Sequence, residues 1–217
     1  MSESTIKVVG TGSIHVVPDV TRLEISIDRV LKSYDEAYEC AKENSSWMVK
    51  ILEYNKMSGK LAKTIRMDIS EHQMNIYQGG KYAGTKKDGY ELDQKIKIDL
   101  GMDNNLINNI VRGVGKFIKE AQINIGYTQQ DPRPTQLKML ERAVKDAHDK
   151  AQIMAKAADR ELGDVTSIEY GKMEISIYSQ ARNICCEEAS HCTPESLDIT
   201  PDDLVVSDNV HVEWELK

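Results

Sequence analysis

The chain of 217 residues contains only four cysteines, five prolines and one phenylalanine, and aromatic residues make up 6% of it. The four cysteines, Cys40, Cys185, Cys186 and Cys192, are too few and too clustered for the disulfide framework of a small secreted fold. A long apolar run is also absent, so no segment approaches the roughly 18 apolar residues of a membrane-spanning helix. We therefore expect reduced thiols and a mainly aliphatic core.

The low number of basic residues argues against nucleic acids and anionic lipids as partners. Its 28 lysines and arginines are outnumbered by 35 acidic residues, which gives a formal net charge of −7. Because a general nucleic-acid binder needs a basic face, and so does a protein that docks on anionic lipids, we expect neither nucleic acid nor membrane insertion. The first residues lack the apolar segment of a signal peptide, which predicts a cytoplasmic protein.

Alternating apolar and polar residues predict several strands, most clearly over 90–100, where one face is apolar and the other charged. Helical periodicity marks three other segments, at about 33–58, 103–117 and 134–162. The order ββαββαβαββ predicts an α+β fold, in which two long helices and one short helix pack on a mainly antiparallel sheet. We expect a single domain over 1–217, with an irregular, cysteine-containing loop at about 179–201.

Local signals indicate where some of these elements begin or bend. Ser33 followed by Glu36 forms a capping box at the start of the first helix, and Asp103 is the expected cap of the second. The parity of the apolar residues changes around Glu71 and His72, which predicts a β-bulge there.

Apolar stripes indicate the buried faces of the helices. Tyr34 and Tyr38 belong to the stripe of the first helix, and Leu137, Ala147 and Met154 to that of the third. Such stripes usually pack in the core. Where a stripe is wider than one sheet face can cover, its remaining apolar residues would form an oligomer interface.

The stretch "VVGTGSIHVV" contains Gly10 and Gly12 after an apolar start, as a dinucleotide-binding loop does. That loop needs a third glycine at position 15 and a helix immediately afterwards. His15 stands there instead, and the following residues have a strand pattern. We therefore expect the glycines to mark a bend, a bulge or a close backbone approach rather than a phosphate site, and we expect no cofactor.

Four soft-ligand side chains, those of Cys185, Cys186, His191 and Cys192, lie within eight positions. They are candidates for binding zinc or a similar metal, although adjacent cysteines chelate one tetrahedral ion poorly and no C-x₂-C spacing is present. An irregular loop with incidental thiols, or a redox-sensitive pair, is the favoured interpretation, so no metal site is predicted.

The remaining polar candidates have no identifiable chemistry. His15 and His72 have no identifiable acid partner or nucleophile nearby in the sequence, and we expect them to be solvated or hydrogen-bonded. His148 sits between aspartates on the polar flank of a helix, where we expect a surface role. A lysine-rich connection is a candidate for an anionic partner or a device that keeps a sheet edge from pairing; its residues are Lys81, Lys86 and Lys87, with Tyr82 and Tyr90.

Four segments in order resemble the SIMPL-domain family, a domain of unknown function. They are "IKVVGTGSIHVVPDVTRLEISI", "GYELDQKIKIDLGMDNNLINNIV", "ERAVKDAHDKAQIMAKAADRELGDVTSIEY" and "ITPDDLVVSDNVHVEWELK". The resemblance implies an α+β fold, no established enzyme activity and no agreed catalytic residues. It links the chain to proteins of oxidative-stress defence, periplasmic immunogenic proteins and signalling adaptors, some of which form homo-oligomers. Many relatives carry an export signal that is absent here, and the Cys–His cluster is not part of the family pattern.

These observations predict a non-enzymatic protein that acts by self-association or partner binding, with stress responses as its candidate role. One alternative is a ligand-binding, thiol-redox or metal-responsive protein that uses the Cys185–Cys192 loop. Another is a hydrolase whose residues come together from distant strands. We expect a homo-oligomer, with a protein partner as the other candidate.

Overall fold

A computed structural model describes residues 4–171, 179–185 and 203–217, the second of these ranges as backbone only. Its elements in chain order are β1 (Thr5–Val16), β2 (Val20–Leu31), α1 (Tyr34–Tyr54), the 3₁₀ turn η1 (Gly59–Leu61), β3 (Lys63–Gln78), β4 (Lys81–Gly101), α2 (Asn104–Phe117), β5 (Ala121–Thr128), α3 (Arg133–Ala157), β6 (Leu162–Glu169), β7 (Ser179–Cys185) and β8 (Leu204–Leu216). The predicted α+β class is confirmed. In the described ranges, no helix combines the length and apolar character needed to cross a membrane.

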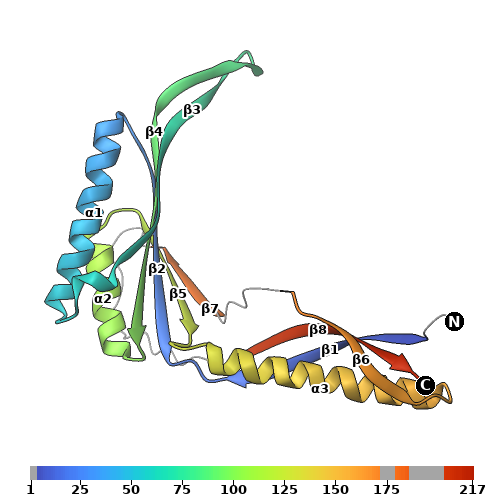
Figure 1. Cartoon of the computed structure of the whole chain (residues 1–217). Coiled ribbons are helices and arrows are strands. Elements are labelled where there is room, and N and C mark those ends of the chain that lie inside the picture. Colours follow the sequence, from blue (N-terminus) through green and yellow to red (C-terminus); the bar gives the residue numbers. More distant parts are fainter. Residues whose placement is uncertain (1–3, 172–178, 186–202) are drawn as a thin grey trace. The chain divides into compact units, whose positions relative to one another are not determined.

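The chain folds into two compact units. The first comprises Met1–Pro18, Gln129–Ser179 and Asp202–Lys217, and the second Asp19–Thr128 and Gln180–Pro201. Each has its own sheet, with strand order β1-β8-β6 in the first unit and β3-β4-β2-β5-β7 in the second (Figure 1). The helices are therefore divided between two sheets, whereas the sequence pattern indicated one. Strand β7 runs through the start of the segment expected to be irregular, because it finds its partner at the β5 edge.

In the first unit, α3 lies along the β1-β8-β6 sheet. Strand β1 pairs antiparallel with β8 over its whole length, from Thr5 opposite Glu215 to Val16 opposite Leu204, with no shift of register. The buried face of α3 is built mainly from alanines; its residues are Met139, Ala143, Ala147, Ala151 and Ala155. The predicted stripe of α3 was wrong at Leu137 and Met154, which are 68% and 52% exposed.

Gly10 and Gly12 are the points where α3 comes closest to β1. A β-carbon on Gly10 would overlap the carbonyl oxygen of Ala143, and one on Gly12 would overlap that of Met139. Because the β1–β8 register is continuous, the expected bulge is wrong, and close backbone approach is the correct interpretation. The short alanine side chains of α3 and the bare glycines of β1 together allow helix and sheet backbones to meet.

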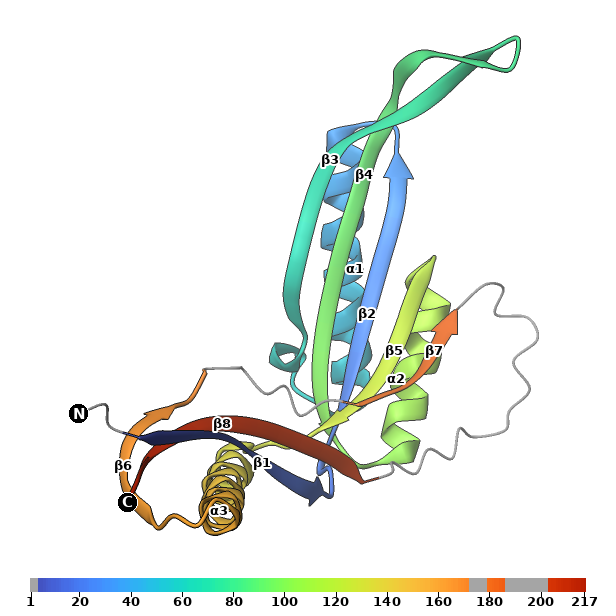
Figure 2. The same ribbon diagram turned by 90° about the vertical axis from the view of Figure 1, so that its right-hand side faces the viewer.

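In the second unit, α1 and α2 cover one face of the five-stranded sheet (Figure 2). The core lies between the sheet and these two helices. Its strand residues include Leu23, Ile25, Ile96, Ile98 and Ile123, and its helix residues include Met48, Leu52, Ile110 and Val114. The opposite face of the central strands is charged, with Arg22 paired to Asp99, Lys95 to Glu24 and Arg66 to Asp93. The predicted alternation of β4 thus separates a core face from a charged face.

The predicted caps are present at the starts of α1 and α2. Ser33 Oγ accepts from the Glu36 amide at 3.2 Å, while the Glu36 carboxylate accepts from the Lys32 amide. Asp103 caps α2 by accepting from the amides of Asn105 and Leu106. The inward stripe predicted for α1 was wrong at Tyr34 and Tyr38, which are about half exposed, while Ala37 is buried instead. Further along the stripe, Ala41 is buried as predicted.

A buried polar network fixes α1 on β4. The Gln94 side chain is fully buried; its Nε2 donates to the Ala41 carbonyl and to Ser45 Oγ, both at 3.0 Å. Asn44 Nδ2 donates to Gln94 Oε1 at 3.1 Å. Every polar atom of the Gln94 side chain is therefore bound to α1, which sets the position of that helix along the strand.

Candidate functional site

A long two-stranded ribbon projects from the second unit. Strand β2 pairs with β4 only as far as Tyr90, so among the described residues no third strand lies beside residues 72–89 of the β3–β4 hairpin. Figure 1 shows this ribbon continuing past the N-terminal end of α1. The β-bulge predicted near Glu71 and His72 is confirmed, as a register shift between His72 and Gln73. We call residues 72–89 the hairpin ribbon.

The hairpin ribbon exposes large apolar side chains, of which the sequence pattern singled out Tyr82 alone. Met74, Tyr77 and Tyr82 are 49%, 64% and 62% exposed, and the two tyrosine rings meet edge to face with centroids 6.1 Å apart. Residues 73–87 contain three lysines and no acidic residue. Lys87 is paired to Glu71, so Lys81 and Lys86 supply the exposed positive charge beside these apolar side chains, and together they form a surface suited to an acidic partner with apolar side chains.

At the base of the hairpin ribbon, charges are paired. Lys87 Nζ contacts Glu71 at 2.6 Å and donates to the Tyr90 hydroxyl at 2.8 Å. The hydrogen bond to Glu71 is the main reason that the pKa of Lys87 is raised. His72 is half-buried, with its Nδ1 3.8 Å from the carboxylate of Asp88. Of the predicted lysines, Lys87 is thus held in place, and Lys81 and Lys86 remain exposed on the ribbon.

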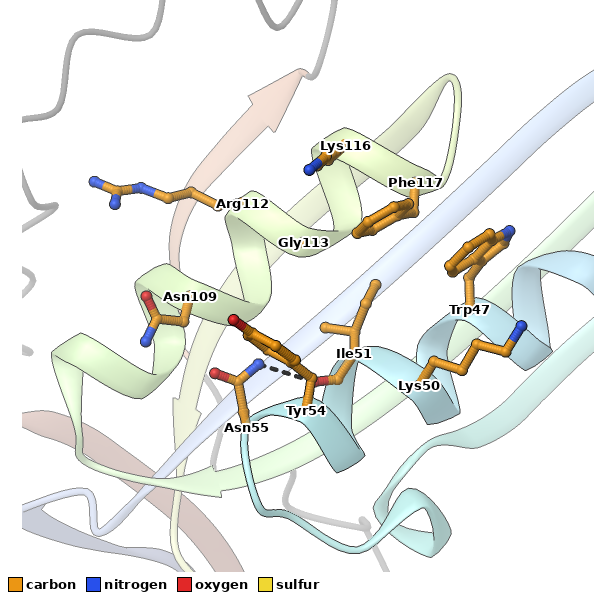
Figure 3. Close-up of a pocket in the computed structure, with 10 residues that line it drawn as sticks. All are labelled: Trp47, Lys50, Ile51, Tyr54, Asn55, Asn109, Arg112, Gly113, Lys116 and Phe117. Atoms are coloured by element: carbon orange, nitrogen blue, oxygen red, sulfur yellow. Dashed lines mark hydrogen bonds between the residues drawn. The ribbon is translucent and has the colours of Figure 1, made fainter.

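A second surface is the α1–α2 groove, shown in Figure 3. It is a hollow of about 630 Å³ between the last turns of α1 and the outer face of α2. Ten residues line it: Trp47, Lys50, Ile51, Tyr54, Asn55, Asn109, Arg112, Gly113, Lys116 and Phe117. Because they come from two helices separated in sequence by β3 and β4, sequence periodicity could not bring them together.

Close helix packing makes the floor of the α1–α2 groove. A β-carbon on Gly113 would stand 2.9 Å from a methyl group of Ile51, so the absence of a side chain lets α2 approach α1 there. Beside this contact the rings of Trp47 and Phe117 stack, with centroids 4.6 Å apart and planes 10° apart. The Phe117 side chain is 40% exposed, so one end of the groove has an accessible aromatic wall.

The cysteine cluster lies mostly outside the described residues. Cys185 ends β7, where only the backbone is described, and Cys186, His191 and Cys192 belong to 186–202. Within the described ranges, no group of three potential ligands could hold a metal ion. Cys40 is a free thiol on α1, and Arg29 Nη1 donates to its sulfur at 3.4 Å. The thiol-redox and metal alternative therefore stays a prediction.

The other two candidate histidines, His15 and His148, belong to the first unit. His15 is exposed at the end of β1. His148 is exposed on α3, with its Nδ1 3.6 Å from Asp149 and its ring 6.4 Å from that of the buried Trp214. The structure brings neither of them next to a cysteine or a second histidine, so they form no catalytic arrangement among the described residues.

Comparison with known proteins places the chain in a family. The family model "SIMPL: Protein of unknown function (DUF541)" matches residues 6–214, which run through both units. The chain is 27% identical over 165 residues to "Uncharacterized protein YggE" of Escherichia coli (strain K12), and equally to the proteins of that name from Escherichia coli O157:H7 and Shigella flexneri. The alignment covers 74% of this chain and 63% of each relative.

Among solved structures, a chain titled "CRISPR associated protein Cas6" aligns over 91% of this chain and 88% of its own length. The TM-score is 0.24 and the sequence identity is 12%, so this alignment says nothing about the fold of the chain. The family match, in contrast, extends over nearly the whole sequence. The chain therefore belongs to the SIMPL family, DUF541, a family of unknown function.

Proposed function

We propose that this SIMPL protein catalyses no reaction and acts by association, with the hairpin ribbon as the binding element and a second copy of the chain as its partner. The observation that carries the proposal is that residues 72–89 form a two-stranded ribbon, unpaired at both edges by any strand that the structure describes, with exposed apolar side chains. Two strands alone are at best marginally stable in water, and an exposed strand edge offers unpaired amides and carbonyls to another chain. A third strand from a partner would pair with the exposed strand edge, and an apolar face from a partner would cover the exposed apolar side chains.

Charge favours a second copy as the partner. Outside the Lys87–Glu71 pair and Asp88 at its base, the hairpin ribbon carries two exposed lysines, Lys81 and Lys86, whereas the chain as a whole carries a net charge of −7. The ribbon of one molecule is therefore attracted to the acidic surfaces of another, and such complementarity raises the rate and specificity of association.

Sizing by light scattering over micromolar concentrations tests the proposal. We expect a defined oligomer for the natural sequence and a monomer for Met74→Lys/Tyr77→Lys, because lysines on a strand edge oppose pairing. The control is Ile153→Lys/Met154→Lys, which places the same charges on exposed apolar positions of α3 and should leave the oligomer unchanged. A monomeric natural protein would contradict self-association. A heterologous partner would then be sought with the ribbon variant as the negative control.

The proposal extends to stress responses, in line with the family resemblance. Survival under peroxide of a strain lacking the gene should be restored by the natural sequence and not by Met74→Lys/Tyr77→Lys. Equal survival with the natural sequence and with the variant would show that the stress role does not depend on the hairpin ribbon.

A further inference from the structure

The α1–α2 groove concentrates positive charge in an otherwise acidic protein. Lys50, Arg112 and Lys116 line it, and no acidic residue of the described ranges does. None of the three has an ion-pair partner among the described residues, in contrast to Lys42, Lys87, Lys95 and Lys150, which are all paired to carboxylates. Three cations around a concave surface raise the local concentration of anions there.

The same groove has an aromatic wall that the cations already contact. Lys50 Nζ lies 4.5 Å from the centre of the Trp47 ring, and Lys116 Nζ lies 5.1 Å from that of Phe117. These contacts place each ammonium group beside an apolar ring rather than beside a counter-charge. A ligand with both an apolar body and an anionic group would therefore meet the ring and the cation together.

The dimensions of the groove favour a small molecule over a protein. Its volume of about 630 Å³ falls within the range of roughly 300–1,000 Å³ for small-ligand pockets. On α1 it extends from Trp47 to Asn55, which is about 12 Å at 1.5 Å per residue. A stable protein interface needs about 800 Å² from each partner, more than two helix turns on each side provide.

We propose that the α1–α2 groove binds a small ligand with a flat apolar body and an anionic group such as a carboxylate, phosphate or sulfonate. Arg112 and Lys116 contact the anion, and the apolar body lies against Phe117 and Trp47. This site is independent of the hairpin ribbon, which lies on other residues of the second unit. It adds a ligand-binding activity to the association proposed above.

A pair of fluorescent probes tests the site. 1-Anilinonaphthalene-8-sulfonate has a flat apolar body and a sulfonate, and N-phenyl-1-naphthylamine has the same rings without the charge. We expect the natural protein to bind the sulfonate about tenfold more tightly than the neutral amine, which corresponds to one favourable charge contact in a partly dry site. Equal affinities for the two probes would overturn the proposal.

Charge reversal locates the anion contact. Arg112→Glu/Lys116→Glu should weaken sulfonate binding about tenfold or more and leave binding of the neutral amine within about twofold. The matched control is Lys138→Glu/Lys145→Glu, which makes the same charge change on exposed positions of α3. All of these changes are on helix surfaces, and far-UV circular dichroism checks that the helices remain. Equal weakening by both double variants would show unspecific attraction and overturn the site.

Tryptophan fluorescence provides a second readout of position. The chain has two tryptophans, Trp47 in the groove and Trp214 buried in the first unit. We expect the sulfonate probe to quench the emission of Trp47 in a Trp214→Phe variant and to leave that of Trp214 much less affected in Trp47→Phe. The reverse pattern would place the probe in the first unit and contradict the proposal.

Discussion

Gly10 of β1 lies directly against the backbone of α3 at Ala143, so closely that a β-carbon on the glycine would overlap the alanine carbonyl oxygen. Since Gly12 meets Met139 in the same way, two alternate residues of one strand line up with one turn of the helix. The contact joins the N-terminal strand to a helix far along the chain. In the first unit the backbones of α3 and β1 therefore approach closely at these glycines.

Gly10→Val should therefore destabilise the first unit. The new side chain meets backbone rather than a flexible side chain, so α3 must move away from β1, and we expect a loss of about 3 kcal/mol in the free energy of unfolding. Urea unfolding followed by circular dichroism measures it. Gly101→Ala is the control, because no heavy atom lies within 4 Å of the added β-carbon. An unchanged urea midpoint for Gly10→Val would show that α3 does not pack on β1 as described.

Gln94→Met should destabilise the second unit although the volume of the side chain is nearly kept. The change removes the acceptor of Asn44 and the donor to the Ala41 carbonyl in a fully buried site, and we expect a cost of about 1–3 kcal/mol. Gln122→Met, at an exposed position of β5, should change the urea midpoint little. Equal effects of the two substitutions would mean that the polar network does not hold α1 on β4.

The second unit should lose stability in acid through Asp99. Burial alone would raise the pKa of Asp99, but the Arg22 guanidinium, bound at 2.7 and 3.0 Å, outweighs it and holds the pKa below its usual value. A carboxyl group with a lowered pKa in the folded state stabilises the fold above its unfolded pKa. That contribution is lost as the pH falls through the folded value.

Urea midpoints measured from neutral pH into the acid range test this effect. The natural sequence should lose stability steadily on acidification, and Asp99→Asn should start lower at neutral pH and show a flatter acid dependence. Asp68→Asn, on the exposed edge strand β3, serves as the control. Identical pH profiles for the natural sequence and Asp99→Asn would contradict the stated role of the Arg22–Asp99 pair.

Local patterns in the sequence were sufficient for the features that depend on neighbouring residues. Short stretches of sequence were enough to predict the alternation in β4, the helix caps at Ser33 and Asp103, and the bulge after His72. Each rests on the period of side-chain direction or on a hydrogen bond to an amide two or three residues away. Such signals do not depend on the rest of the fold.

Tertiary structure alone decided which surfaces meet. The pairing of Thr5 with Glu215 and the division into two sheets involve residues at opposite ends of the chain. The buried face of α3 consists of Met139 and four alanines rather than Leu137 and Met154, because this face brings the helix backbone against Gly10 and Gly12. The α1–α2 groove likewise exists only once Gly113 packs on Ile51, so periodicity in either helix could not reveal it. Family membership follows from the sequence, and both proposed binding surfaces come from the packing of distant segments.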